Sequence, residues 1–117
     1  MATVSLTAAD FSRVVDENEV VLVDFWASWC GPCRMFAPIF EKASEGQPGI
    51  VFAKVDTESE QELAAAAHIT SIPTLMAFKS GQLVFSQPGA LPASALEQLI
   101  EAIQRLDLED ATTERAS

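Results

Sequence analysis

Two cysteines, Cys30 and Cys33, are the residues of this chain whose type and spacing most directly suggest chemistry. They are its only cysteines, and they follow an apolar stretch, three positions apart. On one helical turn, side chains three residues apart lie about 5–6 Å from each other. A disulfide accepts Cα separations of about 4.4–6.8 Å. The pair can therefore close to a disulfide and reopen to two thiols with little movement of the backbone.

A helix that begins at this pair would make Cys30 the more reactive cysteine. The thiolate is the nucleophilic form, and the unpaired N–H groups and dipole of a helix N-terminus stabilise it, which lowers cysteine pKa values to about 3.5–7.5 in known cases. Cys30 would receive most of this field, whereas Cys33 would lie deeper and be more buried. Pro32 stiffens the turn, so we expect Gly31 and Pro32 to tune the redox balance.

Length and composition indicate one globular domain. The chain has 117 residues, of which 49% are apolar, enough to bury a core without further cross-links. The first twenty residues contain no basic head and no long apolar segment, which predicts a soluble, cytoplasmic chain. The net charge of −10 is spread along the chain, which argues against nucleic acids and anionic membranes as partners.

Alternating strands and helices must position the cysteines. The run Val20–Trp26 is almost entirely apolar, as expected of a strand buried on both faces of a sheet. Further strands are expected at Thr3–Leu6, Ile50–Asp56, Thr74–Lys79 and Gln82–Gln87, and helices after Thr7, from Cys30 to Gly46, at Ser59–Ala67 and from Pro92. Apolar periodicity fades after Leu106, so we expect one domain over residues 1–106 and a flexible acidic tail over 107–117.

The central succession of strand, helix and strand implies a right-handed crossover between parallel strands. The cysteines then lie at the carboxyl end of a central strand, where open α/β sheets usually place their sites. The sequence thus predicts an α/β fold with a redox site at one edge of its sheet.

The segments around the cysteines resemble the thioredoxin family. The matching segments are VDFWASWCGPCRMFAP at Val23–Pro38, Ile72 to Thr74, FKSGQ at Phe78–Gln82, and Pro88 to Ala90. The resemblance covers nearly the whole predicted domain. It implies a thioredoxin fold, with a mixed central sheet of about five strands and two helices on each face. It also implies a protein-disulfide oxidoreductase with no bound cofactor, whose redox-active group is the Cys30–Cys33 disulfide.

The resemblance also assigns roles outside the cysteine pair. Asp24 matches the family's buried acid beneath the disulfide, where desolvation should raise its pKa and let it exchange a proton with Cys33. Lys54 matches a lysine that lies near that acid and tunes it. Pro73 matches a cis-proline, which leaves the Ile72 backbone free to pair with an extended substrate segment. The apolar docking surface is expected at Trp29, Ile72, Gly89 and Ala90.

Three residues beside this docking surface depart from the family's pattern. Thr70 replaces a residue that is often basic, Ser71 replaces a common glycine, and Pro88 replaces a branched apolar residue. The chemistry of the cysteines is unaffected by these changes. Because the three residues flank the docking surface, they bear on which partner proteins the chain prefers.

Four other interpretations compete with this one. A zinc site needs about four ligands, and His68 is the only obvious addition to the cysteines. A purely structural disulfide in so small a loop would remove little chain entropy. A binding or chaperone module with an incidental dithiol would not require Asp24 and Pro73 to be intact. A disulfide-forming oxidant is the main rival among enzymes, but Gly31 and Pro32 resemble the reductant branch.

We therefore expect a monomeric protein-disulfide reductase. In this hypothesis Cys30 attacks a substrate disulfide, and Cys33 then attacks the Cys30 sulfur to release the reduced substrate. The resemblance implies diverse disulfide-bearing protein substrates. It also implies that a flavin-dependent thioredoxin reductase, which uses NADPH, restores the dithiol.

Overall fold

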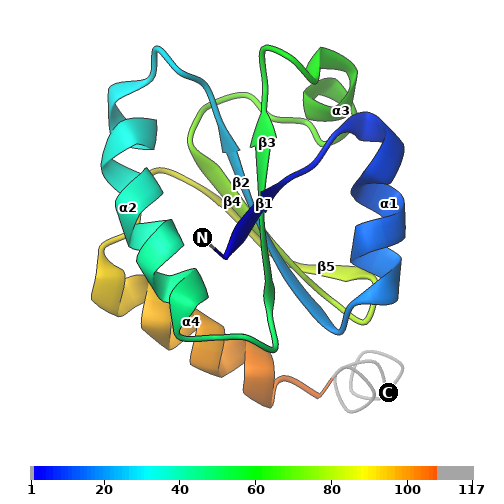
Figure 1. Cartoon of the computed structure of the whole chain (residues 1–117), viewed down its shortest axis with the longest axis vertical. Helices are drawn as coiled ribbons and strands as arrows, with labels where there is room; N and C mark the ends of the chain where they lie inside the picture. The colour runs from blue at the N-terminus through cyan, green and yellow to red at the C-terminus, as the bar shows by residue number, and fades with distance from the viewer. Residues whose placement is uncertain (1, 108–117) are drawn as a thin grey trace, which may run out of the picture.

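The computed structural model describes residues 2–107, which form a five-stranded sheet between two layers of helices (Figure 1). The strands are β1 (Thr3–Ser5), β2 (Val20–Trp26), β3 (Val51–Asp56), β4 (Thr74–Lys79) and β5 (Gln82–Pro88). The helices are α1 (Ala8–Glu17), α2 (Gly31–Glu45), α3 (Gln61–Ala66) and α4 (Ala93–Arg105).

The sheet is mixed, with strand order β1-β3-β2-β4-β5. β3 pairs in parallel with both β1 and β2, whereas β4 runs antiparallel to β2 and to β5. Helices α1 and α3 cover one face, and α2 and α4 cover the other (Figure 1). The predicted fold, a mixed sheet of five strands with two helices on each face, is confirmed.

Strand β2 is buried on both faces, and its alternating side chains divide between two apolar cores. Val20 and Leu22 pack with Phe36 and Phe40 of α2. The intervening residues Val21, Val23 and Phe25 pack in the core beneath α1 and α3. By this alternation Asp24 points to the face that α2 covers, and it is fully buried there. The packing of one strand therefore places a carboxyl group beneath the helix that carries the cysteines.

Helix α3 is shorter than the predicted Ser59–Ala67. It begins at Gln61 because the Asp56 carboxylate accepts hydrogen bonds from the backbone N–H groups of Glu58 and Ser59 and holds them in a turn. The helix ends at Ala66. His68, two residues further on, has a φ of 58°, a left-handed backbone conformation with which a right-handed helix cannot continue.

The predicted tail over residues 107–117 lies outside the described residues, apart from Asp107.

Within residues 2–107, no helix is both long enough and apolar enough to cross a membrane.

Lys79, the last residue of β4, fixes the end of α4. Its side chain is buried, and its ammonium group donates hydrogen bonds to the backbone oxygens of Ile103 (2.7 Å), Gln104 (2.9 Å) and Leu106 (2.7 Å). The last carbonyl groups of a helix have no partners within it, and a cation there also interacts favourably with the helix dipole. One lysine thus joins the central sheet to the last helix.

We predict that Lys79→Met lowers the free energy of unfolding by about 1.5–3 kcal/mol, the typical contribution of hydrogen bonds to a charged group. Urea denaturation of both proteins measures the change. The matched control is Lys42→Met, which removes a lysine from the outer side of α2 and should cost less than about 0.5 kcal/mol. Equal stability of the two variants would show that Lys79 does not anchor α4.

Candidate active site

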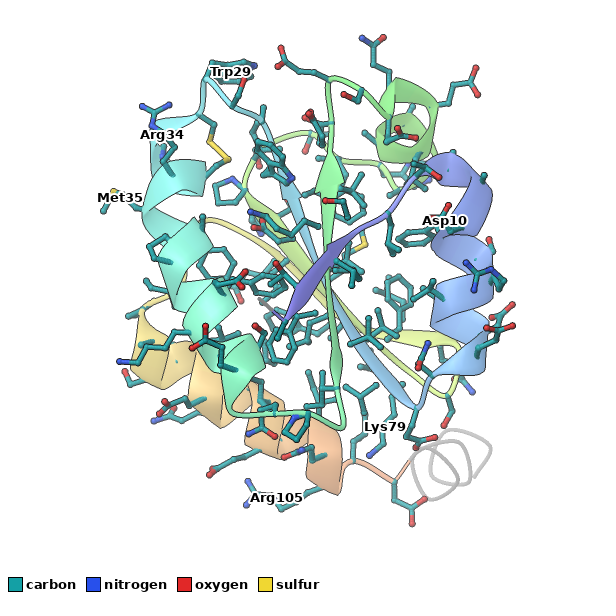
Figure 2. The ribbon with its side chains drawn as sticks, in the orientation of Figure 1. Asp10, Trp29, Arg34, Met35, Lys79 and Arg105 are labelled. Carbon is teal, nitrogen blue, oxygen red and sulfur yellow. A yellow bond between two sulfur atoms is a disulfide. The ribbon has the colours of Figure 1, made fainter. Side chains whose placement is uncertain are left out.

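Cys30 and Cys33 form a disulfide across the first turn of α2, with Cα atoms 5.2 Å apart (Figure 2). Cys30 is the N-cap residue of the helix, and Pro32 lies in the first turn, where its missing N–H group leaves no acceptor unpaired. The backbone N–H of Cys33 donates to the Cys30 sulfur at 3.2 Å. This helix end is therefore arranged to stabilise negative charge on Cys30 Sγ when the disulfide is open.

The burial of the two sulfurs differs less than the sequence predicts. In the disulfide form Cys30 is 3% exposed and Cys33 is 2% exposed. Their surroundings differ more. Cys30 lines an outer groove, whereas Cys33 lines a small cavity of about 100 Å³ behind the disulfide, beside Trp26 and Lys54. Cys30 is thus the cysteine that lines the larger groove, in which a segment of another protein could bind.

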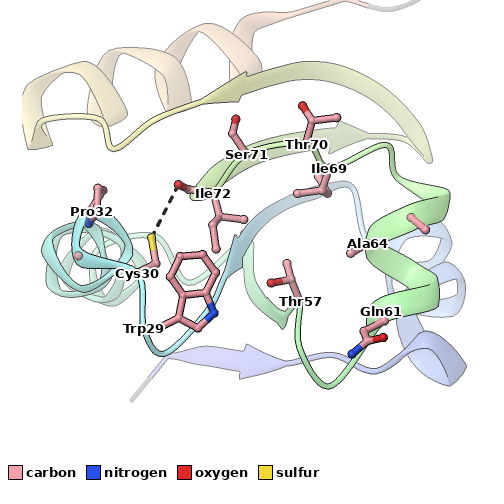
Figure 3. Close-up of a pocket in the computed structure, with 12 residues that line it drawn as sticks. Trp29, Cys30, Pro32, Thr57, Gln61, Ala64, Ile69, Thr70, Ser71 and Ile72 are labelled. Atoms are coloured by element: carbon pink, nitrogen blue, oxygen red, sulfur yellow. Dashed lines mark hydrogen bonds between the residues drawn. The ribbon is translucent and has the colours of Figure 1, made fainter.

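A loop from a distant part of the chain packs against the disulfide. Its Ile72–Pro73 peptide bond is cis, the form that the resemblance implies. The Ile72 carbonyl oxygen lies 3.7 Å from Cys30 Sγ (dashed line in Figure 3). The N–H of Gly89 donates to the Pro73 oxygen at 2.7 Å, which ties a second loop to the first. Gly89 has a φ of +99°, a conformation that favours glycine.

The expected docking residues surround the sulfur in different ways. Trp29 is 66% exposed, Ile72 is half-buried, and Gly89 and Ala90 are exposed. The indole Nε1–H of Trp29 donates to the Glu58 carboxylate at 3.0 Å. Glu58 could not be predicted from the sequence, because no motif links a residue in the loop before α3 to a tryptophan 29 positions earlier.

The three departures from the family's pattern are not equivalent. Thr70 and Ser71 line the outer groove, and Ser71 also accepts a hydrogen bond from the Thr74 hydroxyl through its backbone oxygen. Pro88 lies outside the groove lining, at the end of β5, where it pairs with Thr74. Thr70 and Ser71 are therefore the two departures that line the groove beside Cys30.

Asp24 has the environment expected of a proton-exchanging acid. Both of its carboxylate oxygens are buried without a hydrogen-bond partner. Desolvation raises the pKa of Asp24 to about 6, although the positive charge of Lys54 acts in the opposite direction. Lys54 pairs with Asp24 across β2 and β3, and its ammonium group lies 5.0 Å from the centre of the Trp26 ring. An acid with a pKa near neutrality can both accept and return a proton.

A metal centre was one alternative for the cysteines. Within residues 2–107, no group of three or more His, Cys, Asp and Glu side chains is arranged to hold a metal ion. His68 lies beyond the end of α3 and does not line the cavities next to the disulfide. The described cysteines are joined to each other instead.

Comparison with known proteins connects this geometry to one family. The family model described as Thioredoxin matches residues 2–102. The chain belongs to the thioredoxin family. It is 52% identical over 109 residues to a protein named Putative thioredoxin 2 from Streptomyces coelicolor, and the match covers 93% of this chain and 81% of that protein. It is 41% identical over 102 residues to Thioredoxin-1 of Saccharomyces cerevisiae, covering 87% and 98% of the two chains.

Solved thioredoxin structures have the same fold. A mutant thioredoxin from Halobacterium salinarum aligns with a TM-score of 0.81 at 36% identity, covering 90% of this chain and 92% of that one. A Plasmodium falciparum thioredoxin aligns with a TM-score of 0.79 at 41% identity, covering 86% and 97%. Membership of the family makes the chain a protein-disulfide oxidoreductase, and Cys30–Cys33 is its redox-active disulfide.

The raised pKa of Asp24 predicts an unusual pH dependence of stability. The carboxyl titrates near 3.8 when unfolded and near 6 when folded, so the folded state binds the proton more tightly. This contribution to stability is full below about pH 4 and is lost as the pH rises through about 6, a change of about 3 kcal/mol. We therefore predict that Asp24→Ala is more stable than wild type at pH 7, and that this advantage disappears at pH 4.

Urea denaturation of the disulfide form at the two pH values measures this difference. Asp16→Ala removes an exposed carboxyl from α1 and serves as the control, which as a surface substitution should stay within about 0.5 kcal/mol of wild type at both pH values. If Asp24→Ala differs from wild type by the same amount at pH 4 and pH 7, Asp24 does not titrate with a raised pKa.

Proposed function

We propose that the protein acts in the cytoplasm as a reductant of disulfides in other proteins. The observation that carries the proposal is a redox disulfide at a helix N-terminus, with an open groove on one side and a buried acid behind it. A reductant must be kept in the dithiol form, which requires a reducing compartment. Gly31 and Pro32 between the cysteines support this direction, because they match the reductant branch of the family.

In the first step the Cys30 thiolate attacks one sulfur of a substrate disulfide. A disulfide forms between Cys30 and the substrate, and the other substrate sulfur leaves as a thiolate that takes a proton from water. Two observations support Cys30 as the attacking group: it lines the groove, and the Cys33 N–H is directed at its sulfur.

In the second step Cys33 transfers its proton to Asp24 and attacks Cys30 Sγ. The Cys30–Cys33 disulfide forms, the bond to the substrate breaks, and the second substrate sulfur leaves as a thiolate that is protonated. Two electrons have then passed from the protein to the substrate. The pKa of Asp24 and its position on the face under α2 support its role as proton acceptor. The charge of Lys54 tunes that pKa.

The substrate segment binds in an extended form along the cis-Pro loop. Its backbone pairs with Ile72 beside Pro73, which brings the attacked sulfur to Cys30. Trp29, Gly89 and Ala90 form the surrounding apolar surface. Two observations support this arrangement: the Trp29 ring is exposed, and the hydrogen bond from Gly89 N–H to the Pro73 oxygen holds the Gly89 loop beside the cis-Pro loop.

A second protein must return electrons to the oxidised form. We propose that this partner is a flavin-dependent thioredoxin reductase that uses NADPH, and that the substrates are diverse disulfide-bearing proteins, with this chain acting as a monomer. Family membership supports a reductase of this kind as the usual electron donor.

Substitution of each cysteine should stop disulfide exchange at a different step. Cys33→Ser should accumulate a covalent mixed disulfide with an oxidised protein substrate such as insulin, because Cys30 still attacks but nothing resolves the intermediate. Cys30→Ser should form none. Intact-protein mass spectrometry detects the adduct as a mass increase that dithiothreitol removes.

Turnover provides the second half of this test. Wild-type protein with NADPH and a thioredoxin reductase should reduce insulin catalytically, and both variants should be inactive while remaining folded by circular dichroism. If Cys33→Ser traps no substrate, or if either variant supports normal turnover, dithiol exchange does not carry the function and the binding-module interpretation replaces it.

A further inference from the structure

The groove beside Cys30 extends well beyond the sulfur. It has a volume of about 640 Å³ and runs from Trp29 and Cys30, past Thr57, to Gln61 and Ala64 of α3 (Figure 3). The loop Ile69–Ile72 lines it as well. A segment whose cysteine lies at Cys30 can therefore place several neighbouring residues toward α3.

The α3 end of this groove carries unpaired negative charge. A second hollow of about 360 Å³ shares Gln61 with the groove and is lined by three carboxylates, Glu58, Glu60 and Glu62. The ion pair Arg13–Glu17 lies on α1, and among the described residues no lysine or arginine forms an ion pair with these three carboxylates. We call Glu58, Glu60 and Glu62 the acidic edge.

Glu58 brings the acidic edge to the wall of the groove. Its carboxylate accepts the hydrogen bond from Trp29 Nε1, and the exposed Trp29 ring lines the groove beside Cys30. Glu60 is held in place because it accepts a hydrogen bond from the backbone N–H of Ala8. In both contacts the donor is a neutral N–H group, so neither hydrogen bond brings a positive charge to the acidic edge.

The opposite side of the disulfide carries a positive charge. Arg34 follows Cys33 on α2, is exposed, and donates a hydrogen bond from its guanidinium group to the Ser28 backbone oxygen at 2.9 Å (Figure 2). The site is therefore polarised, negative toward α3 and positive toward α2. A polarised site orients a charged segment as well as attracting it.

We propose that the groove selects disulfide-bearing segments with lysine or arginine close to the attacked cysteine, and that the acidic edge is the specificity-determining element. This inference rests on the proposed function and names the substrate class of the same site. The basic side chains lie at the α3 end of the groove, against Glu58 and Glu62. Exposed charges attract a partner mainly by raising its association rate, and salt weakens the effect.

Peptides that differ only in charge test the proposal. Each contains one cysteine as a mixed disulfide with a fluorescent thiol, and carries three Lys, three Gln or three Glu residues either before or after that cysteine. Reduction by the full dithiol protein is followed as fluorescence release at low salt. For one of the two placements, the Lys peptide should react about three- to tenfold faster than the Glu peptide, and about 0.5 M salt should reduce this ratio.

Charge-neutralising variants locate the effect. Glu58→Gln with Glu62→Gln removes two charges, while the amide oxygen at position 58 can still accept the Trp29 hydrogen bond. The control, Glu97→Gln with Glu101→Gln, makes the same change in net charge on exposed positions of α4, which covers the other face of the sheet. The rate ratio of Lys to Glu peptides should fall to about one in the first variant and persist in the control.

The outcomes separate this inference from the proposed function. Equal rates for all peptides, or an equal loss of preference in both variants, would overturn the acidic edge while leaving the reductase intact. Failure of the wild-type dithiol to reduce any peptide would overturn both.

Discussion

The placement of one sulfur at the N-cap of α2 is the constraint on which the site depends. Strand β2 is buried on both faces, so its end is fixed, and a short connection leads from Trp26 to the start of α2 at Gly31. That geometry directs the N–H of Cys33 at Cys30 Sγ and brings the Ile72 oxygen to 3.7 Å from the same atom. Charge stabilisation, substrate approach and closure of the disulfide therefore all act on a single atom.

The same strand explains why a carboxyl group is kept where it costs stability. An isolated buried carboxylate is unfavourable, and it is tolerated when its pKa rises enough for the group to remain partly protonated. Among the described residues neither oxygen of Asp24 has a hydrogen-bond partner, and the positive charge of Lys54 offsets this cost only in part. Asp24 lies on the same face of β2 as Leu22, the face that α2 covers, and the role proposed for it there is to exchange a proton with Cys33.

Regular elements could be predicted from the sequence, whereas contacts between distant loops could not. Val20–Trp26 was predicted with the bounds observed because an apolar run of that length is typical of a buried strand. Thr74–Lys79 was predicted with the bounds observed because Ser80 and Gly81 mark the turn of a hairpin. The predicted start of α3 was two residues too early, because the Asp56 side chain holds residues 58 and 59 in a turn that the apolar periodicity of the sequence does not reveal. The resemblance supplied the cis form of Pro73. The contact between Trp29 and Glu58 and the charge around the groove required the structure.

Selective alkylation of the reduced protein measures how reactive each cysteine is. If the helix N-terminus stabilises the thiolate of Cys30, this cysteine reacts before Cys33. Brief treatment with iodoacetamide near pH 6, followed by peptide mass mapping, gives the rate at each cysteine. The predicted result is modification of Cys30 at least about tenfold faster than Cys33, because thiolate content and access both favour it. Equal rates, or faster modification of Cys33, would show that the helix N-terminus does not make Cys30 the reactive cysteine.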